Sequence, residues 1–418
     1  MIKVYVLSPS LSLKDGIAYH AFYQAIWLSK IKDLEVYLIG CIQNSDEKII
    51  TKNRDVHLHI IKIRNRDIFT YFRLLKKILK KAHNDKIIIH GHGTLSSILP
   101  YIKILSTTYH SWGNSKLITV NTLHGVAFHY NLQRIRNRSI LMHGVINFRH
   151  YINRITYSIY ELLTSAINGI VNYNMIDFHI ATCNYALQLS RKYYFIPYNK
   201  LALIPHSVDH KIYRPRRKEK LKEYLSNFIP ENIINADIII GTVAPLFYRK
   251  GIIFLLKSFI KVLKSEKDVK LLIIGRGYLY PFLISLIKRL DLMHHIHIVA
   301  EYIPEHLFPF IYSLFDIYIL PTLYEPGIST SLLQAMSSGL PVITTSVGGN
   351  TEVLMHEING ILIRPFNVKE LAQYISILIA DPKFAKTLGL NARKTIIAKY
   401  SWQTNSIKIY KIYKNLII

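Results

Sequence analysis

One segment of the chain has the residue types and order of a site for a charged ligand. It is Pro321–Pro341, and it reads PTLYEPGISTSLLQAMSSGLP. The apolar run Ile317–Leu320 predicts a strand before it, and Leu332–Met336 predicts a helix inside it. The residues at the start of this helix would present backbone N–H groups; they are Gly327, Ile328, Ser329 and Thr330. This order predicts a phosphate site beyond a parallel strand, although it also occurs in α/β proteins without such a ligand.

The elements that would position this segment recur along the whole chain. Short β-branched runs alternate with longer segments of helical period, which is typical of βαβ units and parallel sheets. The predicted strands are Val4–Leu7, Val36–Ile39, Ile87–His90, Ile118–Leu123, Ile238–Val243, Leu271–Ile274, Ile317–Leu320 and Val342–Thr344. They fall into two groups, and a length of 418 residues suits two α/β domains of about 200 residues each. We interpret Tyr213–Asn232, which is basic and contains prolines, as an interdomain connection with a short surface helix.

The chain is strongly basic, with 53 Lys and Arg against 26 Asp and Glu and a net charge of +27. Such a charge attracts nucleic acid, anionic membranes or phosphorylated small molecules. It is also compatible with a surface that is simply rich in lysine. The sequence has no helix-turn-helix, zinc or RNP signature, so we expect no nucleic-acid partner.

Few features suggest export or a membrane span. Only two cysteines are present, Cys41 and Cys183, too few for a disulfide framework. The longest apolar candidate, Leu162–Ile176, is interrupted by three asparagines and is shorter than the ~18 residues that a span needs. The N-terminus has no apolar signal region. We therefore expect a cytoplasmic protein.

The segment Pro321–Pro341 resembles the donor-binding signature of the retaining glycosyltransferases of family 4. That signature has two glutamates separated by seven residues, followed by Ala-Met and a small residue before Gly-x-Pro. The resemblance assigns Glu325 to the donor's sugar and phosphate, and Gln334 to the position of the ribose-binding glutamate. Gln334 lies nine residues after Glu325 instead of eight, and its amide can still bond ribose hydroxyls.

Further matches to family 4 follow in the family's order. Gly16, in Asp-Gly-Ile after the first strand, resembles the loop that closes over the donor phosphates. His124, in Thr-Leu-His-Gly, resembles the strand-end histidine that contacts the transferred sugar, although a histidine here can also simply cap a strand. Ile204–Asp209 resembles the family's hinge, and Asp381–Trp402 spans its closing segment.

The segment Gly241–Gly251, GTVAPLFYRKG, resembles the family's cationic clamp for the diphosphate. Lys250 matches the lysine of the clamp. The family's arginine is absent five or six residues earlier, and Arg249 is the substitute that we predict. The alternative is an ordinary solvated basic turn.

The resemblance implies the GT-B architecture, an α/β fold of two Rossmann-like domains that face a central cleft. Residues 1–205, with a returning C-terminal helix at 402–418, would bind the acceptor, and residues 206–401 would bind the nucleotide-sugar donor. The implied reaction moves a hexose from a UDP- or GDP-sugar to a glycan, lipid-linked or polysaccharide-precursor acceptor with retention. The alternatives are a related GT-B epimerase or phosphorylase, or a basic nucleic-acid-binding protein, which the charge alone suggests.

No Asp-x-Asp pair occurs in the sequence, so we expect no metal and no other cofactor. Lys250, Arg249 and the helix amides would then stabilise the leaving diphosphate. The acceptor side would include Gln133–Arg154, where five arginines alternate with apolar residues. Such a surface can bind anionic lipids, which predicts peripheral association with the cytosolic face of a membrane, and a charged helix face packed on its own domain is the alternative.

Overall fold

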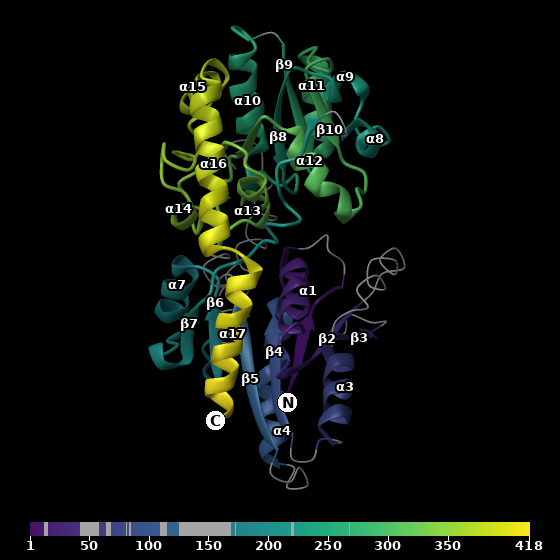
Figure 1. Ribbon diagram of the computed structural model, residues 1–418, viewed down its shortest axis with the longest axis vertical. Coiled ribbons are helices and arrows are strands. Elements are labelled where there is room, and N and C mark those ends of the chain that lie inside the picture. Colours follow the sequence, from purple (N-terminus) through teal and green to yellow (C-terminus); the bar gives the residue numbers. More distant parts are fainter. Residues whose placement is uncertain are drawn as a thin grey trace, which may run out of the picture. The chain divides into compact units, whose positions relative to one another are not determined.

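The computed structural model describes two compact units (Figure 1). The described residues are 1–11, 16–41, 58–63, 68–80, 82, 85–108, 115–124, 169–171, 173–218, 221–266 and 268–418. The first unit comprises Met1–His206 and Trp402–Ile418, and the second comprises Ser207–Ser401. The boundary after His206 therefore lies one residue later than the boundary after residue 205 that the sequence predicts.

The first unit is built on a seven-stranded parallel sheet with the order β3-β2-β1-β4-β5-β6-β7. Its strands are β1 (Ile2–Ser8), β2 (Leu34–Cys41), β3 (Leu58–Ile63), β4 (Lys86–His92), β5 (Lys116–Leu123), β6 (Phe178–Ala181) and β7 (Leu201–Leu203). Its α-helices are α1 (Gly16–Leu28), α3 (Ile68–Lys80), α4 (Leu99–Thr108), α7 (Asn184–Tyr194) and α17 (Trp402–Ile417). Short 3-10 helices cover Gly93–Ile98 and Tyr198–Lys200.

Helices cover both faces of this sheet because β1 is apolar on both sides. Val4 and Val6 belong to a core cluster that includes buried residues of α1 and α17. Tyr5 and Leu7 belong to the opposite cluster, with α3 and α4. The alternation places α1 and α17 on one face and α3 and α4 on the other.

The second unit contains a six-stranded parallel sheet with the order β10-β9-β8-β11-β12-β13. Its strands are β8 (Ile238–Val243), β9 (Val269–Ile274), β10 (Ile296–Val299), β11 (Ile317–Leu320), β12 (Val342–Thr345) and β13 (Ile361–Ile363). Its helices are α8 (Leu221–Leu225), α9 (Glu231–Ile234), α10 (Ile252–Val262), α11 (Tyr280–Arg289), α12 (Phe308–Leu314), α13 (Thr330–Ser337), α14 (Asn350–Val353), α15 (Val368–Ala380) and α16 (Pro382–Lys399). Two 3-10 helices, η5 and η6, cover Tyr248–Lys250 and Glu305–Leu307.

The basic segment Tyr213–Asn232 is part of the second unit and does not connect the two units. Tyr213 is 1% exposed, and its hydroxyl donates a hydrogen bond to Glu305. The basic residues and prolines suggested an interdomain connection with a short surface helix. The short helix is present as α8, but its buried Leu221 and Leu225 anchor the segment to the second unit. Among the described residues, no helix is both long and apolar enough to cross a bilayer.

Candidate functional site

Three loops at the carboxyl ends of β8, β11 and β12 approach one another through their backbones. Gly251 has φ +71°, and a Cβ atom there would lie 1.8 Å from the carbonyl oxygen of Pro321. Gly348 has φ +53°, and a Cβ atom there would lie 1.8 Å from the carbonyl oxygen of Glu325. Both positions need glycine, because the left-handed conformation and the close approach exclude a side chain. The two glycines thus fix the loops after β8 and β12 against the loop that carries Glu325.

Lys250 and Glu325 form a buried ion pair at this junction. The Lys250 Nζ atom donates a hydrogen bond to Glu325 Oε2. The two residues are only 5% and 8% exposed, although they lie 75 positions apart in the sequence. Burial lowers the pKa of Lys250, and the charge of Glu325 opposes that shift by favouring the ammonium form. The carboxylate therefore helps to keep a cation inside the protein.

Arg249 adds a second cation beside the same carboxylate. Its Nη1 atom lies 3.9 Å from Glu325 Oε1, and its side chain is 32% exposed, against 7% for Lys250. The buried Arg249 Nη1 atom has no hydrogen-bond partner among the residues that the structure describes. The backbone carbonyl of Arg249 accepts a hydrogen bond of 2.7 Å from the Leu323 N–H, which fixes the turn. The guanidinium thus retains donor capacity that an anionic ligand could use.

The helix that the sequence places after Glu325 is α13, and its first residue is Thr330. Ser329 is the N-cap, and its side chain does not cap the helix but shares a 3.1 Å hydrogen bond with Ser331. Gly327 and Ile328 lie in the preceding loop, where the Gly327 carbonyl accepts a bond from the Gly349 N–H. The positive end of the α13 dipole therefore lies a few residues after Glu325 in the chain.

Gln334 lies in a buried network of tyrosines. Its amide oxygen accepts a 2.9 Å hydrogen bond from Tyr312, and its amide nitrogen donates a 2.9 Å bond to Tyr213. Tyr213 in turn donates to Glu305. Among the described residues, Gln334 makes no hydrogen bond to Lys250 or Glu325. Its contact with a ribose therefore stays a prediction, and making that contact would require Gln334 to share or exchange its bonds to Tyr312 and Tyr213.

Sequence reasoning missed this tyrosine network. Its members come from three separate segments of the second unit, and each tyrosine alone has the appearance of an ordinary core residue. The hydrogen bond from Tyr213 to the partly buried Glu305 extends this polar network beyond Gln334.

Glu305 makes the stability of the second unit depend on pH. Burial raises its pKa from 4.5 to about 8, and the hydrogen bond from Tyr213 opposes the shift only in part. The folded state therefore favours the protonated carboxyl, so stability is greatest below pH 4.5 for this group and is lost as the pH rises through 8. Glu305→Gln stays neutral and should remove that loss. We expect the melting midpoint of the variant, relative to the native protein, to rise by roughly 5 °C between pH 5 and pH 9.

The matched control is Glu301→Gln, because Glu301 is exposed on the same unit. Its melting midpoint should follow that of the native protein at every pH. If the melting midpoints of Glu305→Gln and of the native protein change in parallel with pH, Glu305 is not protonated in the folded protein.

The remaining predicted site residues lie in the first unit. Gly16 is the first residue of α1, and His124 follows β5. His124 contacts two other histidines, with 3.0 Å between its Nδ1 and His206 Nε2 and 3.0 Å between its Nε2 and His92 Nδ1. The sequence singled out His124 alone, and the group around it arises from segments far apart in the chain. Asp15, Gly125 and the basic stretch Gln133–Arg154 lie outside the described residues.

Part of the second unit is similar in sequence to known glycosyltransferases. Residues 226–395 match the family model described as "Glycosyl transferases group 1". An uncharacterized glycosyltransferase of Methanocaldococcus jannaschii is 32% identical over 173 residues, which cover 41% of this chain and 43% of that protein. An MMP alpha-(1→4)-mannosyltransferase of Mycolicibacterium hassiacum is 26% identical over 52% of this chain and 49% of that protein. The match thus spans about half the length of these relatives.

Solved structures resemble the chain over its whole length. A glycosyltransferase of Rickettsia africae has a TM-score of 0.72 at 20% identity and covers 100% of this chain and 98% of its own. The Anabaena protein HepE in complex with UDP-glucose has a TM-score of 0.72 at 15% identity, covering 99% of this chain and 100% of its own. At these identities the likeness shows the fold. The chain has the GT-B fold of two parallel-sheet α/β domains, and its residues 226–395 are similar to the glycosyl transferases group 1 family.

Proposed function

We propose that this protein is a retaining glycosyltransferase that moves a hexose from a UDP- or GDP-sugar to a glycan, lipid-linked or polysaccharide-precursor acceptor. The observation that carries the proposal is the buried Lys250–Glu325 pair with Arg249 beside it, inside the group 1 domain. The HepE structure with UDP-glucose supports a nucleotide sugar as donor. The net charge of +27 supports a peripheral position at the anionic cytosolic face of a membrane.

Cleavage of a nucleotide sugar breaks the bond between the anomeric carbon and a diphosphate oxygen, which gains negative charge. Lys250 and Arg249 would neutralise that charge together with the N-terminus of α13. Glu325 would hold the Lys250 ammonium in its charged form. We assign one carboxylate, Glu325, to this site, whereas retaining hydrolases use two. We therefore favour attack by the acceptor hydroxyl on the face that the diphosphate leaves, with the hydroxyl proton passing to a phosphate oxygen.

Donor binding gives the first test. A UDP- or GDP-sugar should raise the melting midpoint of the protein, because a ligand that binds only the folded state stabilises it in proportion to its occupancy. Free DNA should not shift the midpoint comparably at about 150 mM salt, where screening weakens contacts made by charge alone. A sequence-dependent DNA complex that resists salt would overturn the proposal in favour of a nucleic-acid-binding protein.

Turnover assays separate the transferase from its relatives. A transferase consumes donor only when an acceptor is present, and product analysis should show the anomeric configuration retained. An epimerase would convert the donor without an acceptor, and a phosphorylase would require free phosphate.

Metal dependence gives the next prediction. Because Lys250 and Arg249 supply the positive charge, EDTA should leave turnover essentially unchanged, and added Mg²⁺ or Mn²⁺ should not increase it. The measurement is the initial rate before chelation, after chelation and after each ion is returned. A loss on chelation that Mg²⁺ or Mn²⁺ restores would contradict the proposed role of the two side chains.

A further inference from the structure

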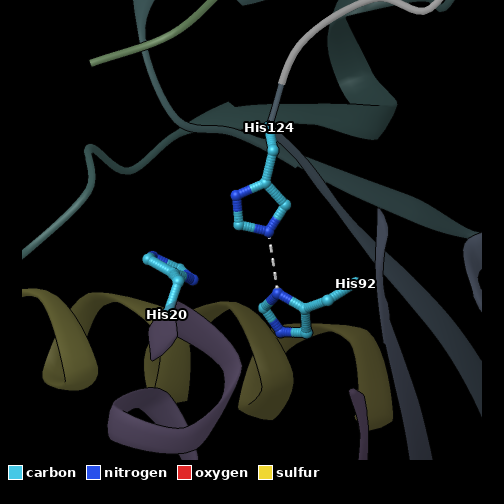
Figure 2. A group of neighbouring side chains, drawn as sticks. All are labelled: His20, His92 and His124. Atoms are coloured by element: carbon cyan, nitrogen blue, oxygen red, sulfur yellow. Dashed lines mark hydrogen bonds between the residues drawn. The ribbon is translucent and has the colours of Figure 1, made fainter. Parts of the chain in front are cut away.

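The first unit contains a buried histidine cluster, which we define as His20, His92 and His124 (Figure 2). His20 projects from α1, His92 is the last residue of β4, and His124 follows β5. Each side chain offers a ring nitrogen, and these three atoms all lie within 4.8 Å of one another. His20 and His92 are buried, and His124 is partly buried. The cluster therefore collects three potential ligand atoms at the carboxyl end of a parallel sheet, on regular elements that fix their positions.

Two nitrogens of the cluster lack partners. His20 Nδ1 and His92 Nε2 are buried and make no hydrogen bond within the described part of the chain. Leaving a buried polar atom without a hydrogen bond is unfavourable, so such atoms in a folded protein call for an explanation. Here both orphaned atoms belong to imidazoles whose rings lie 5.5 Å apart, centre to centre. The orphaned His20 nitrogen, beside the ring nitrogens of His92 and His124, points to an occupant that the protein side chains do not supply.

The ligand chemistry of the cluster also suits a transition-metal ion. Imidazole is the commonest metal ligand in proteins. The cluster contains no carboxylate. Nitrogen ligands alone favour Zn²⁺ and related transition metals over Mg²⁺ and Ca²⁺, which prefer oxygen.

We propose that the histidine cluster binds one Zn²⁺-type transition-metal ion through one nitrogen of each imidazole. Zinc–nitrogen bonds of ~2.0–2.1 Å place tetrahedral ligand atoms ~3.4 Å apart, a spacing that side-chain rotation can reach from the observed arrangement. His92 Nδ1 and His124 Nε2 are already 3.0 Å apart. His206, whose ring centre lies 4.7 Å from that of His20, is adjacent to the fourth coordination position.

This ion would lie in the first unit, whereas the proposed diphosphate site lies in the second. The two proposals can therefore fail independently. Activity that chelation removes and Zn²⁺ alone restores would involve the histidine cluster. Activity restored by Mg²⁺ or Mn²⁺ would instead contradict the role of Lys250 and Arg249.

The test uses the full chain without a purification tag. After dialysis against Zn²⁺ and removal of free metal, elemental analysis should find one ion per chain, and Zn²⁺ should raise the melting midpoint. Co²⁺ should give the visible absorption of a four-coordinate nitrogen site. His20→Ala and His92→Ala should each weaken Co²⁺ binding by at least ~10-fold, because each removes a ligand. The matched control is His294→Ala, since His294 is exposed on the second unit and should not affect binding.

Each variant is first examined without metal by circular dichroism, so that loss of folding is not taken for loss of binding. If one of these two variants is unfolded, metal binding is measured on the other. His92→Gln provides a third variant, which keeps a polar side chain. The proposal is overturned if the native chain does not bind Zn²⁺ or Co²⁺ saturably. It is also overturned if folded variants bind as tightly as His294→Ala, because the metal would then bind other histidines.

Discussion

Lys250→Ala should lower the rate constant for sugar transfer by ~100-fold or more. The ammonium of Lys250 would stabilise charge that develops only as the diphosphate departs, and losing such a group costs most in the transition state. The measurement is a comparison of kcat and kcat/KM for the native protein and the variant. The matched control is Lys257→Ala, because Lys257 is exposed on α10 and should not affect the rate.

The same substitution should also destabilise the protein. The sequence suggests that Lys250 lies on a loop and can be removed without harm, but the structure shows it buried and paired with Glu325. Removing one member of a buried pair typically costs ~3–5 kcal/mol, because the other charge is left without compensation. Arg249, 3.9 Å from Glu325, should reduce that cost in part. The double variant Lys250→Met with Glu325→Gln removes both charges, so it should recover stability while remaining inactive.

Two outcomes would change the assignment. If Lys250→Ala keeps near-normal turnover while Arg249→Ala abolishes it, Arg249 is the residue that neutralises the diphosphate. If neither substitution matters, the donor site lies elsewhere in the chain.

Glu325→Gln should reduce turnover on a similar scale and shift its dependence on pH. The amide keeps the shape of the side chain but removes the charge that favours the Lys250 ammonium. Burial and the positive charge of Arg249 then act on Lys250 without opposition from Glu325, so the pKa of Lys250 should fall further below its usual value. A lysine with a lower pKa loses its proton at lower pH, and the alkaline decline in activity should therefore begin earlier in the variant.

The measurement is kcat/KM across neutral and alkaline pH for Glu325→Gln and for Glu301→Gln, which alters an exposed carboxylate of the same unit. A Glu325→Gln profile that coincides with the native one would show that Glu325 does not control the charge of Lys250. Glu325→Ala should lose as much activity and more stability, since it also leaves a cavity.

The predicted strands are interior strands, four in each sheet, and all of them are present. The missed ones are β3, β6 and β7 in the first unit and β10 and β13 in the second, which include every edge strand. Central parallel strands are covered on both faces and so have continuous apolar sequences. Edge strands are shorter or carry polar residues, as in LHIIKI for β3 and IHIV for β10. Hydrophobic runs alone cannot separate such segments from loops.

The site residues likewise divide into those that the sequence predicts and those that it does not. Lys250, Arg249 and Glu325 were assigned from sequence motifs, and the structure brings their side chains together. The partners of Gln334 and His124 could not be inferred in this way. Tyr213 and Tyr312 reach Gln334 from other segments of the fold, and the histidines around His124 come from α1 and β4. Contacts of this kind depend on sheet order, which local sequence patterns do not contain.

The helix α17 affects the order in which the protein can fold during synthesis. It follows the entire second unit in the sequence, yet its Ile409 and Tyr413 lie in the same core cluster as Val4 and Phe22. On the ribosome, residues 207–401 emerge as one uninterrupted stretch and can complete their core first. The earlier-made N-terminal sheet must wait, with one face of its apolar surface uncovered, until α17 has left the exit tunnel. The first unit, although its sheet is translated before the second unit, is therefore expected to reach its native state after it.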